Sequence, residues 1–84
     1  MISKVSIPVS VEVYFDREKR KNFIRSICWQ GKTYPILTQG FYHHFRKGKN
    51  LIHVFSVADQ NLFFRLSLSS ESLIWTLEEI YGDC

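Results

Sequence analysis

The chain has 84 residues, with 11 Lys/Arg against 8 Asp/Glu, 45% hydrophobic residues and 15% aromatic residues. This length allows one domain over residues 1–84, and the apolar content excludes a disordered tail. There is no basic leader before an apolar run and no apolar segment of about 20 residues, so we expect neither a signal peptide nor a membrane span. Two cysteines, Cys28 and Cys84, are too few for a disulfide scaffold, which favours a reduced, cytoplasmic protein.

Positive charge is concentrated in the first part of the chain. Residues 1–49 contain ten Lys/Arg and three Asp/Glu, a balance of +7, whereas residues 50–84 contain one Lys/Arg and five Asp/Glu, a balance of −4. This asymmetry favours a surface that faces polyanions. Two halves that complement each other are the alternative.

Alternation of apolar and polar residues predicts the first strand at 9–15, where every second side chain from Val9 to Phe15 is apolar and faces one side. Pro8 suits the entry to this strand, because its missing N–H does no harm there. The polar segment 16–22 is expected to be a solvated loop.

Residues 23–30 are expected to form a second strand, which ends at a two-residue hairpin turn made of Gly31 and Lys32. Glycine in the first central position supplies the positive φ that this kind of turn requires. In this register Trp29 lies opposite Tyr34. The two rings are therefore expected to hold the hairpin together rather than to bind a ligand.

Pro35 lies within the third predicted strand and cannot donate a hydrogen bond to a neighbour, which indicates an edge position or a bulge. A bend at Gly40 precedes a fourth strand at 41–46, and residues 47–50 form a turn.

The clearest predicted hairpin joins residues 51–57 to residues 62–68 through a turn at 59–60. Pairing of Ala58 with Asn61 would place Phe55 opposite Phe64 on a continuous apolar face. Further apolar residues on the reverse face favour a hairpin that is covered on both sides.

The C-terminal run 73–81 fits both a helix and a strand. Its apolar residues match one helical face, with Ser70 as N-cap, whereas Leu73, Trp75 and Leu77 alternate as in a strand. Periodicity alone does not decide between them.

Short connections between successive strands predict an all-β fold, an antiparallel meander of six or seven strands that curls or closes into a small barrel. An open curved sheet capped by a C-terminal helix is the alternative.

The segment 23–36, read FIRSICWQGKTYPI, resembles the Trp-x-Gly-Lys/Arg-x-Tyr hairpin of a small, largely uncharacterised bacterial β domain. That domain occurs alone or at the C-terminus of Y-family DNA-polymerase-like proteins of mutagenesis cassettes. The central hairpin 52–66 is similar to that of the family. So is the ending 75–83, with Trp-x-Leu-x-x-Ile-Tyr followed by an acidic residue.

The resemblance covers most of the chain and implies that the C-terminal run is a final strand. It also implies an association with DNA-damage tolerance and DNA repair, and it brings no catalytic residue. His53 stands where the family often has Arg, and residues 41–45 lack a Trp that is common nearby.

Neither an enzyme nor a metal or cofactor site is expected. The neighbours His43 and His44 point to opposite faces of a strand, as do Glu78 and Glu79, so neither pair can act together. No Cys-x-x-Cys or His-x-x-x-His spacing and no nucleophile elbow occurs. His53, alone on an apolar face, is expected to be a partly buried histidine with a backbone or solvent partner.

Two basic clusters, at 17–21 and 46–49, lie on either side of the aromatic run 42–45 in the sequence. Single-stranded nucleic acid binds to such surfaces, because bases stack on rings while cations neutralise phosphates. The face with Tyr42 and His44 is expected to be exposed, and the opposite face is not. The predicted nucleic-acid-binding residues are Arg17, Lys19, Arg20, Lys21, Tyr42, His44, Arg46, Lys47 and Lys49.

The sequence therefore predicts a non-catalytic binding module that contacts single-stranded DNA or RNA. The alternative is a module that docks on a larger, polymerase-like protein through a sheet edge, which Pro35 would mark.

Overall fold

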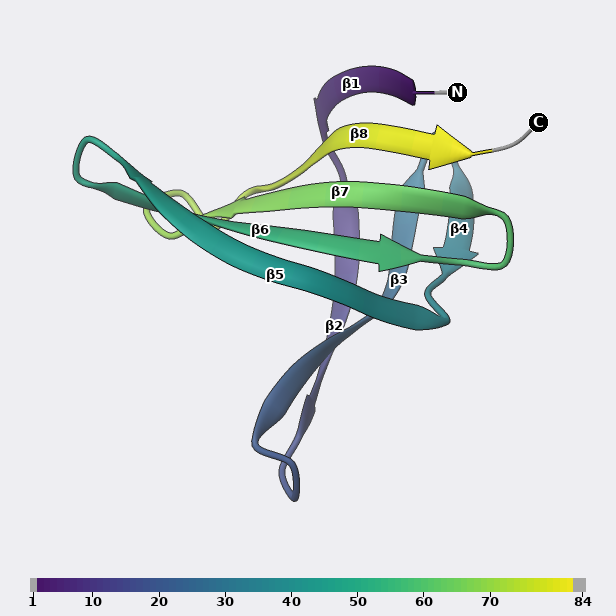
Figure 1. Ribbon diagram of the computed structural model, residues 1–84, viewed down its shortest axis with the longest axis horizontal. Helices are drawn as coiled ribbons and strands as arrows, with labels where there is room; N and C mark the ends of the chain where they lie inside the picture. Colours follow the sequence, from purple (N-terminus) through teal and green to yellow (C-terminus); the bar gives the residue numbers. More distant parts are fainter. Residues whose placement is uncertain (1, 83–84) are drawn as a thin grey trace.

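A computed structural model describes residues 2–82, and within this range the chain forms strands and no helix (Figure 1). The strands are β1 (Ile2–Pro8), β2 (Ser10–Asp16), β3 (Lys21–Trp29), β4 (Lys32–Pro35), β5 (Thr38–Lys47), β6 (Asn50–Ala58), β7 (Leu62–Ser69) and β8 (Trp75–Gly82). The all-β prediction is confirmed, but there are eight strands rather than six or seven. Cys28 is exposed, and Cys84 lies outside the described residues.

The unexpected strand is β1. Its alternation is interrupted by a bulge, where the register against β8 shifts between Lys4 and Ile7 and Ser6 has a φ of 51°. Extra residues of this kind break the period of two that identifies a strand from sequence. Pro8 is the last residue of β1, where it pairs with Thr76, and the chain then passes Val9 into β2.

The strands form two antiparallel sheets and no closed barrel. One sheet has the order β1-β8-β7-β6-β5 and the other has the order β2-β3-β4. The chain passes from one sheet to the other at Val9, whose N–H donates to the Trp75 carbonyl at 3.0 Å. Strands β4 and β5 remain at sheet edges, and the edge position predicted for Pro35 is confirmed.

The core lies between the two sheets. From the small sheet, Ile24 and Ile27 on β3 pack against buried side chains of the large sheet. These side chains are Val57, Phe64, Leu66 and Leu77. The shared core holds the two sheets together as one unit.

The β3–β4 hairpin turns one residue earlier than expected. Gln30 and Gly31 are the central residues, with φ of 53° and 74°, and Trp29 pairs with Lys32. Gly31 therefore takes the second central position, which also requires positive φ in a type I′ turn. Trp29 and Tyr34 are diagonal neighbours rather than opposite, yet their rings still pack, with centroids 6.3 Å apart.

The β6–β7 hairpin has a longer loop than the expected two residues. Asp59 Oδ1 accepts hydrogen bonds from the N–H groups of Asn61 and Leu62, at 2.8 and 2.6 Å, and Ala58 pairs with Phe63. The register is thus displaced by two, so Phe55 lies opposite Leu66 rather than Phe64. A shift of two residues keeps every side chain on the same face of the strand, so the apolar face has the predicted residues.

The C-terminal run is a strand, and the helix alternative is wrong. Residues 70–73 form a turn in which Leu73 has a φ of 60°, and β8 then pairs with both β1 and β7. Leu77 is fully buried and pairs with Leu66 of β7. This pairing requires residues around Leu77 to be extended beside β7, as a strand is.

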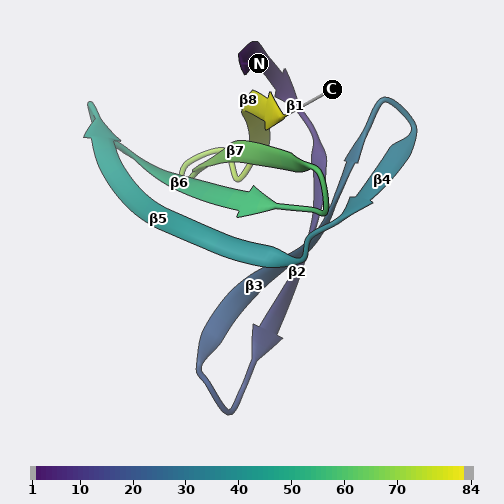
Figure 2. The ribbon, with the colours of Figure 1, turned by 45° about the vertical axis from the view of Figure 1, so that its right-hand side comes forward.

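Two hairpins extend beyond the shared core and diverge from each other (Figures 1 and 2). In the β2–β3 hairpin a bulge shifts the register between Glu12 and Val13, and Val13 and Phe15 are exposed rather than inward-facing. The predicted alternation fails there, because this end of the hairpin has no opposing sheet. The second hairpin is the end of β5–β6.

Candidate nucleic-acid interface

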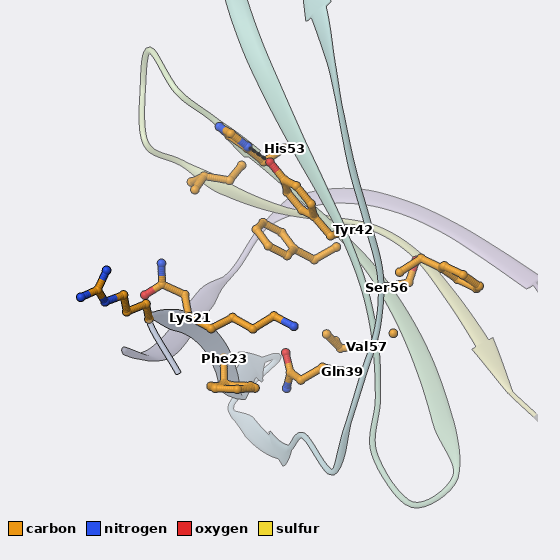
Figure 3. Close-up of a pocket in the computed structure, with 13 residues that line it drawn as sticks. Lys21, Phe23, Gln39, Tyr42, His53, Ser56 and Val57 are labelled. Atoms are coloured by element: carbon orange, nitrogen blue, oxygen red, sulfur yellow. Dashed lines mark hydrogen bonds between the residues drawn. The ribbon is translucent and has the colours of Figure 1, made fainter. Parts of the chain in front are cut away.

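A cleft of about 550 Å³ lies where the β2–β3 hairpin leaves the large sheet (Figure 3). One wall comes from the beginning of β3 and carries Lys21 and Phe23. The other wall comes from β5 and β6 and carries Tyr42, His53 and Phe55. The volume is within the range of ligand pockets in proteins, roughly 300–1,000 Å³.

The width of the cleft is set by Gln39 at the start of β5. Its Nε2 donates to the Ile24 carbonyl at 2.8 Å, and its Oε1 accepts from the Ile24 N–H at 3.1 Å. Next to it, a Cβ on Gly40 would lie 2.6 Å from the Ser56 carbonyl oxygen, so only glycine fits. Gln39 thus joins the two sheets beyond the end of β4.

An aromatic row runs along the side of β5–β6 that faces the cleft and continues onto β8. It is made of His44, His53, Tyr42 and Phe55, with Trp75 on β8. Tyr42 is at its centre, with ring centroids 5.0 Å from Phe55, 5.9 Å from His53 and 6.0 Å from His44. Phe55 continues the row to Trp75 at 5.3 Å. Rings held side by side on a sheet form a surface on which bases can stack.

His53 is partly buried, as expected, but its partner is a side chain rather than backbone or solvent. Its Nδ1 lies 2.6 Å from the Tyr42 hydroxyl, and the two rings are stacked at 18° (Figure 3). This hydrogen bond holds the Tyr42 ring in the row. The strand register brings the two side chains together. Tyr42 pairs with Phe55 and His44 pairs with His53, so Tyr42 and His53 are diagonal neighbours on the same face.

The expectation that only one face of β5 is exposed is wrong. All ten residues of β5 are exposed, and Phe41 and Phe45 on the strand have 85% and 47% of their surface accessible. The reason is the position of β5, which lies at the edge of the large sheet and extends past the small sheet.

The structure places the predicted basic residues on two hairpins instead of one continuous patch (Figure 2). Arg20 and Lys21 line the cleft, and Arg17 and Lys19 belong to the same hairpin end, which we call the basic tip (17–20). Lys19 Nζ lies 5.7 Å from the centroid of the Phe23 ring.

The second basic cluster occupies the far end of the β5–β6 hairpin. Arg46 lies two residues beyond His44, on the same side of β5 as the aromatic row, and Lys49 is in the turn. Lys47 lies on the opposite side, in a shallow hollow with Phe45 and Ile52. Arg46 thus lies near the His44 end of the aromatic row, and Arg20 and Lys21 line the same cleft as Tyr42 and Phe55.

Apart from Glu18 in the basic tip, no acidic residue interrupts this region. Residues 19–58 contain eight Lys/Arg and no Asp/Glu. The ion pairs of the described chain are Arg25–Glu12 at 3.6 Å and Arg65–Glu79 at 2.7 Å. Within residues 2–82, the seven predicted cations thus have no carboxylate partner and are available to phosphates.

Comparisons with known proteins leave the site to be interpreted from its own geometry. No family model, no curated protein and no solved structure matches the chain.

No three His, Cys, Asp or Glu side chains of residues 2–82 lie close enough to hold a metal ion. This part of the chain also has no helix long and apolar enough to cross a membrane.

Tyr42, His44 and the basic residues were predicted from the sequence, whereas Phe23, Gln39 and Phe55 were not. A signal for Phe55 was present, because a turn at 48–49 places Tyr42 opposite Phe55 by counting alone. No such signal exists for Phe23 or Gln39, because their roles depend on how the two hairpins are placed in space.

Proposed function

We propose that this protein is a non-catalytic module that binds single-stranded nucleic acid along the aromatic row. The observation that carries the proposal is the row itself, centred on the half-exposed Tyr42 and flanked by cations without carboxylate partners. Stacking on the rings contributes about 1–3 kcal/mol per base, and the two basic ends neutralise the backbone on either side. Contacts of this kind are led by the phosphate backbone and are weakly specific for sequence.

The proposal is tested by fluorescence anisotropy of a labelled single-stranded oligonucleotide at two salt concentrations. Tyr42→Ala is expected to weaken binding by about 1–3 kcal/mol through the loss of stacking. Phe63→Ala is the control, because Phe63 is 61% exposed against 51% for Tyr42 and lies on β7, outside the row and the cleft.

Charge is tested with a second pair of variants. Arg46→Ala should reduce the salt dependence by about 0.7 per lost phosphate contact on a single strand. Lys4→Ala removes the same charge from β1, at the opposite edge of the large sheet, and should leave binding unchanged. Absence of binding at low salt, or equal effects of the two variants, would exclude the proposed surface.

Docking on a larger protein is a second candidate, favoured by the exposed edge of β5. Ten consecutive exposed residues at a sheet edge offer backbone groups to an added strand. The resemblance noted above suggests a Y-family polymerase-like partner. Under this alternative, Phe45→Ser weakens capture of such a protein in a pull-down while the affinity for the oligonucleotide is retained.

A further inference from the structure

The cleft contains a cation that a flat stacking surface does not need. Figure 3 shows the Lys21 side chain reaching into the cleft, past Phe23, towards Gln39 and Val57. Within the described residues Lys21 makes no ion pair. Lys21 is exposed, so its ammonium group is solvated in the free protein and stays available to an anionic ligand.

The walls around Lys21 are suited to a flat ring. Phe23 lies on the β3 side, Tyr42 and Phe55 lie on the other side, and Leu68 adds an aliphatic surface. A ligand with an aromatic ring and an anionic group satisfies both properties of the cleft. Nucleotides have this combination.

We propose that the cleft binds one unstacked nucleotide, with its base between Phe23 and the Tyr42–Phe55 wall and its phosphate at Lys21. This inference rests on the proposed function and names the unit that the site takes from a single strand. A base in a duplex is already paired and stacked and must be extruded before it can enter such a cleft, so the site prefers unpaired nucleotides.

The polar groups of the cleft divide into those that are engaged and those that are free. Both ends of the Gln39 amide bind Ile24, so Gln39 holds the walls and does not contact the base. Asn22 also lines the cleft, and its side chain makes no hydrogen bond within the described chain. Asn22 therefore offers a free amide to the polar edge of the base, and Ser56, which also lines the cleft without a side-chain hydrogen bond in the described chain, offers a hydroxyl.

The test uses the full chain, labelled with ¹⁵N, in an NMR titration with a nucleoside monophosphate. Separate arms use the nucleoside alone and inorganic phosphate alone. We expect the monophosphate to shift the amide signals of residues 21–23 and 40–42 and to displace the labelled single-stranded oligonucleotide. Each half of the ligand alone is expected to bind more weakly than the monophosphate.

Variants separate the cleft from general charge. Lys21→Ala should lower the affinity for the monophosphate at least about tenfold, the usual effect of losing one charged hydrogen bond, while Lys21→Arg retains most of it. Lys4→Ala is the matched control, because Lys4 is an exposed cation on β1 and lies outside the cleft. Dispersed amide signals verify that each variant is folded.

The outcomes distinguish this inference from the proposed function. If the oligonucleotide binds but the monophosphate neither shifts the cleft signals nor competes, the cleft inference is overturned and strand binding stands. Equal effects of Lys21→Ala and Lys4→Ala overturn it in the same way. Binding of the monophosphate without the oligonucleotide supports the cleft and overturns strand binding, and binding of neither overturns both.

Discussion

The side-chain amide of Gln39 makes the hydrogen bonds to Ile24 that the backbone of a neighbouring strand would otherwise make. Pairing between β3 and β4 ends at Ser26 and Pro35, and beyond that point the Gln39 amide hydrogen-bonds both backbone groups of Ile24. A side-chain amide carries one donor and one acceptor in the geometry of a peptide group, so it can satisfy both. Ile24 is in the core, so this contact couples the shape of the cleft to the stability of the fold.

Replacing Gln39 by Ala should therefore destabilise the protein. The change leaves the N–H and C=O of Ile24 without these partners, and a cost of about 1–3 kcal/mol is expected in chemical denaturation. Gln60→Ala, at an exposed loop position, is the control and should stay within about 0.5 kcal/mol of the parent. Equal stabilities of the two variants would show that Gln39 does not join the sheets.

Tyr81 provides a pH-dependent prediction. Its hydroxyl donates to Glu79 Oε1 at 2.6 Å, and this hydrogen bond, with desolvation, raises the pKa of Tyr81 above its ordinary value, although Arg65 opposes the rise. NMR titration of the tyrosine rings should show Tyr81 ionising above the usual pKa of about 10. Glu79→Gln removes the carboxylate and should lower the pKa of Tyr81.

The sign of the effect on stability follows from this shift. Because the pKa of Tyr81 is higher in the folded than in the unfolded chain, the interaction stabilises the fold below the ordinary tyrosine pKa. The contribution is lost as the pH rises through the folded pKa. A pKa of Tyr81 that does not change in Glu79→Gln would contradict the assigned cause.

Among the structural elements, the β3–β4 turn can be improved by one substitution. Gln30 has a φ of 53°, a conformation that asparagine adopts far more readily than glutamine, and Asn-Gly is the preferred type I′ pair. Gln30→Asn should raise the free energy of unfolding by about 0.5 kcal/mol, a fraction of the roughly 1–2 kcal/mol that the left-handed conformation costs.

The neighbouring glycine provides the opposite test. A Cβ on Gly31 would meet nothing within 4 Å, so Gly31→Ala changes only the backbone preference at φ of 74°. A loss of about 1 kcal/mol is expected. Thermal unfolding of the two variants should shift in opposite directions, and shifts in the same direction would contradict the turn type.

Sequence patterns predicted most strands and their faces, but not the registers of two hairpins. The minimal loop assumed for β6–β7 ignores that the Asp59 carboxylate can accept from two backbone N–H groups and hold a longer loop. Local sequence patterns likewise predict only part of the site. The basic residues and Tyr42 are recognisable locally, whereas Phe23 joins them only through the placement of a second hairpin.

For the whole molecule, alternation does not specify which strands become neighbours. A meander of hairpins closes into a barrel only if each strand pairs with the next one and the last strand pairs with the first. Here the chain changes sheets at Val9, so β1 pairs with β8 while β2 pairs with β3. That crossing leaves the edge of β5 open and turns the β2–β3 hairpin outward, which creates the cleft.

Because both sheets share one core, we expect them to unfold together. Ile27 belongs to the small sheet, is fully buried and packs in one cluster with Phe64 and Leu66 of the large sheet. Ile27→Val should lower the stability by about 0.5–1.5 kcal/mol. Hydrogen exchange measured by NMR should show this loss equally in the most protected amides of β3 and of β7, because those amides exchange only through global unfolding.

Val13→Ala, at a 41% exposed position on β2, is the control and should affect only amides near the basic tip. Faster exchange in β3 alone after Ile27→Val would mean that the small sheet opens independently. The cleft between the sheets would then lack the rigid walls that nucleotide binding requires.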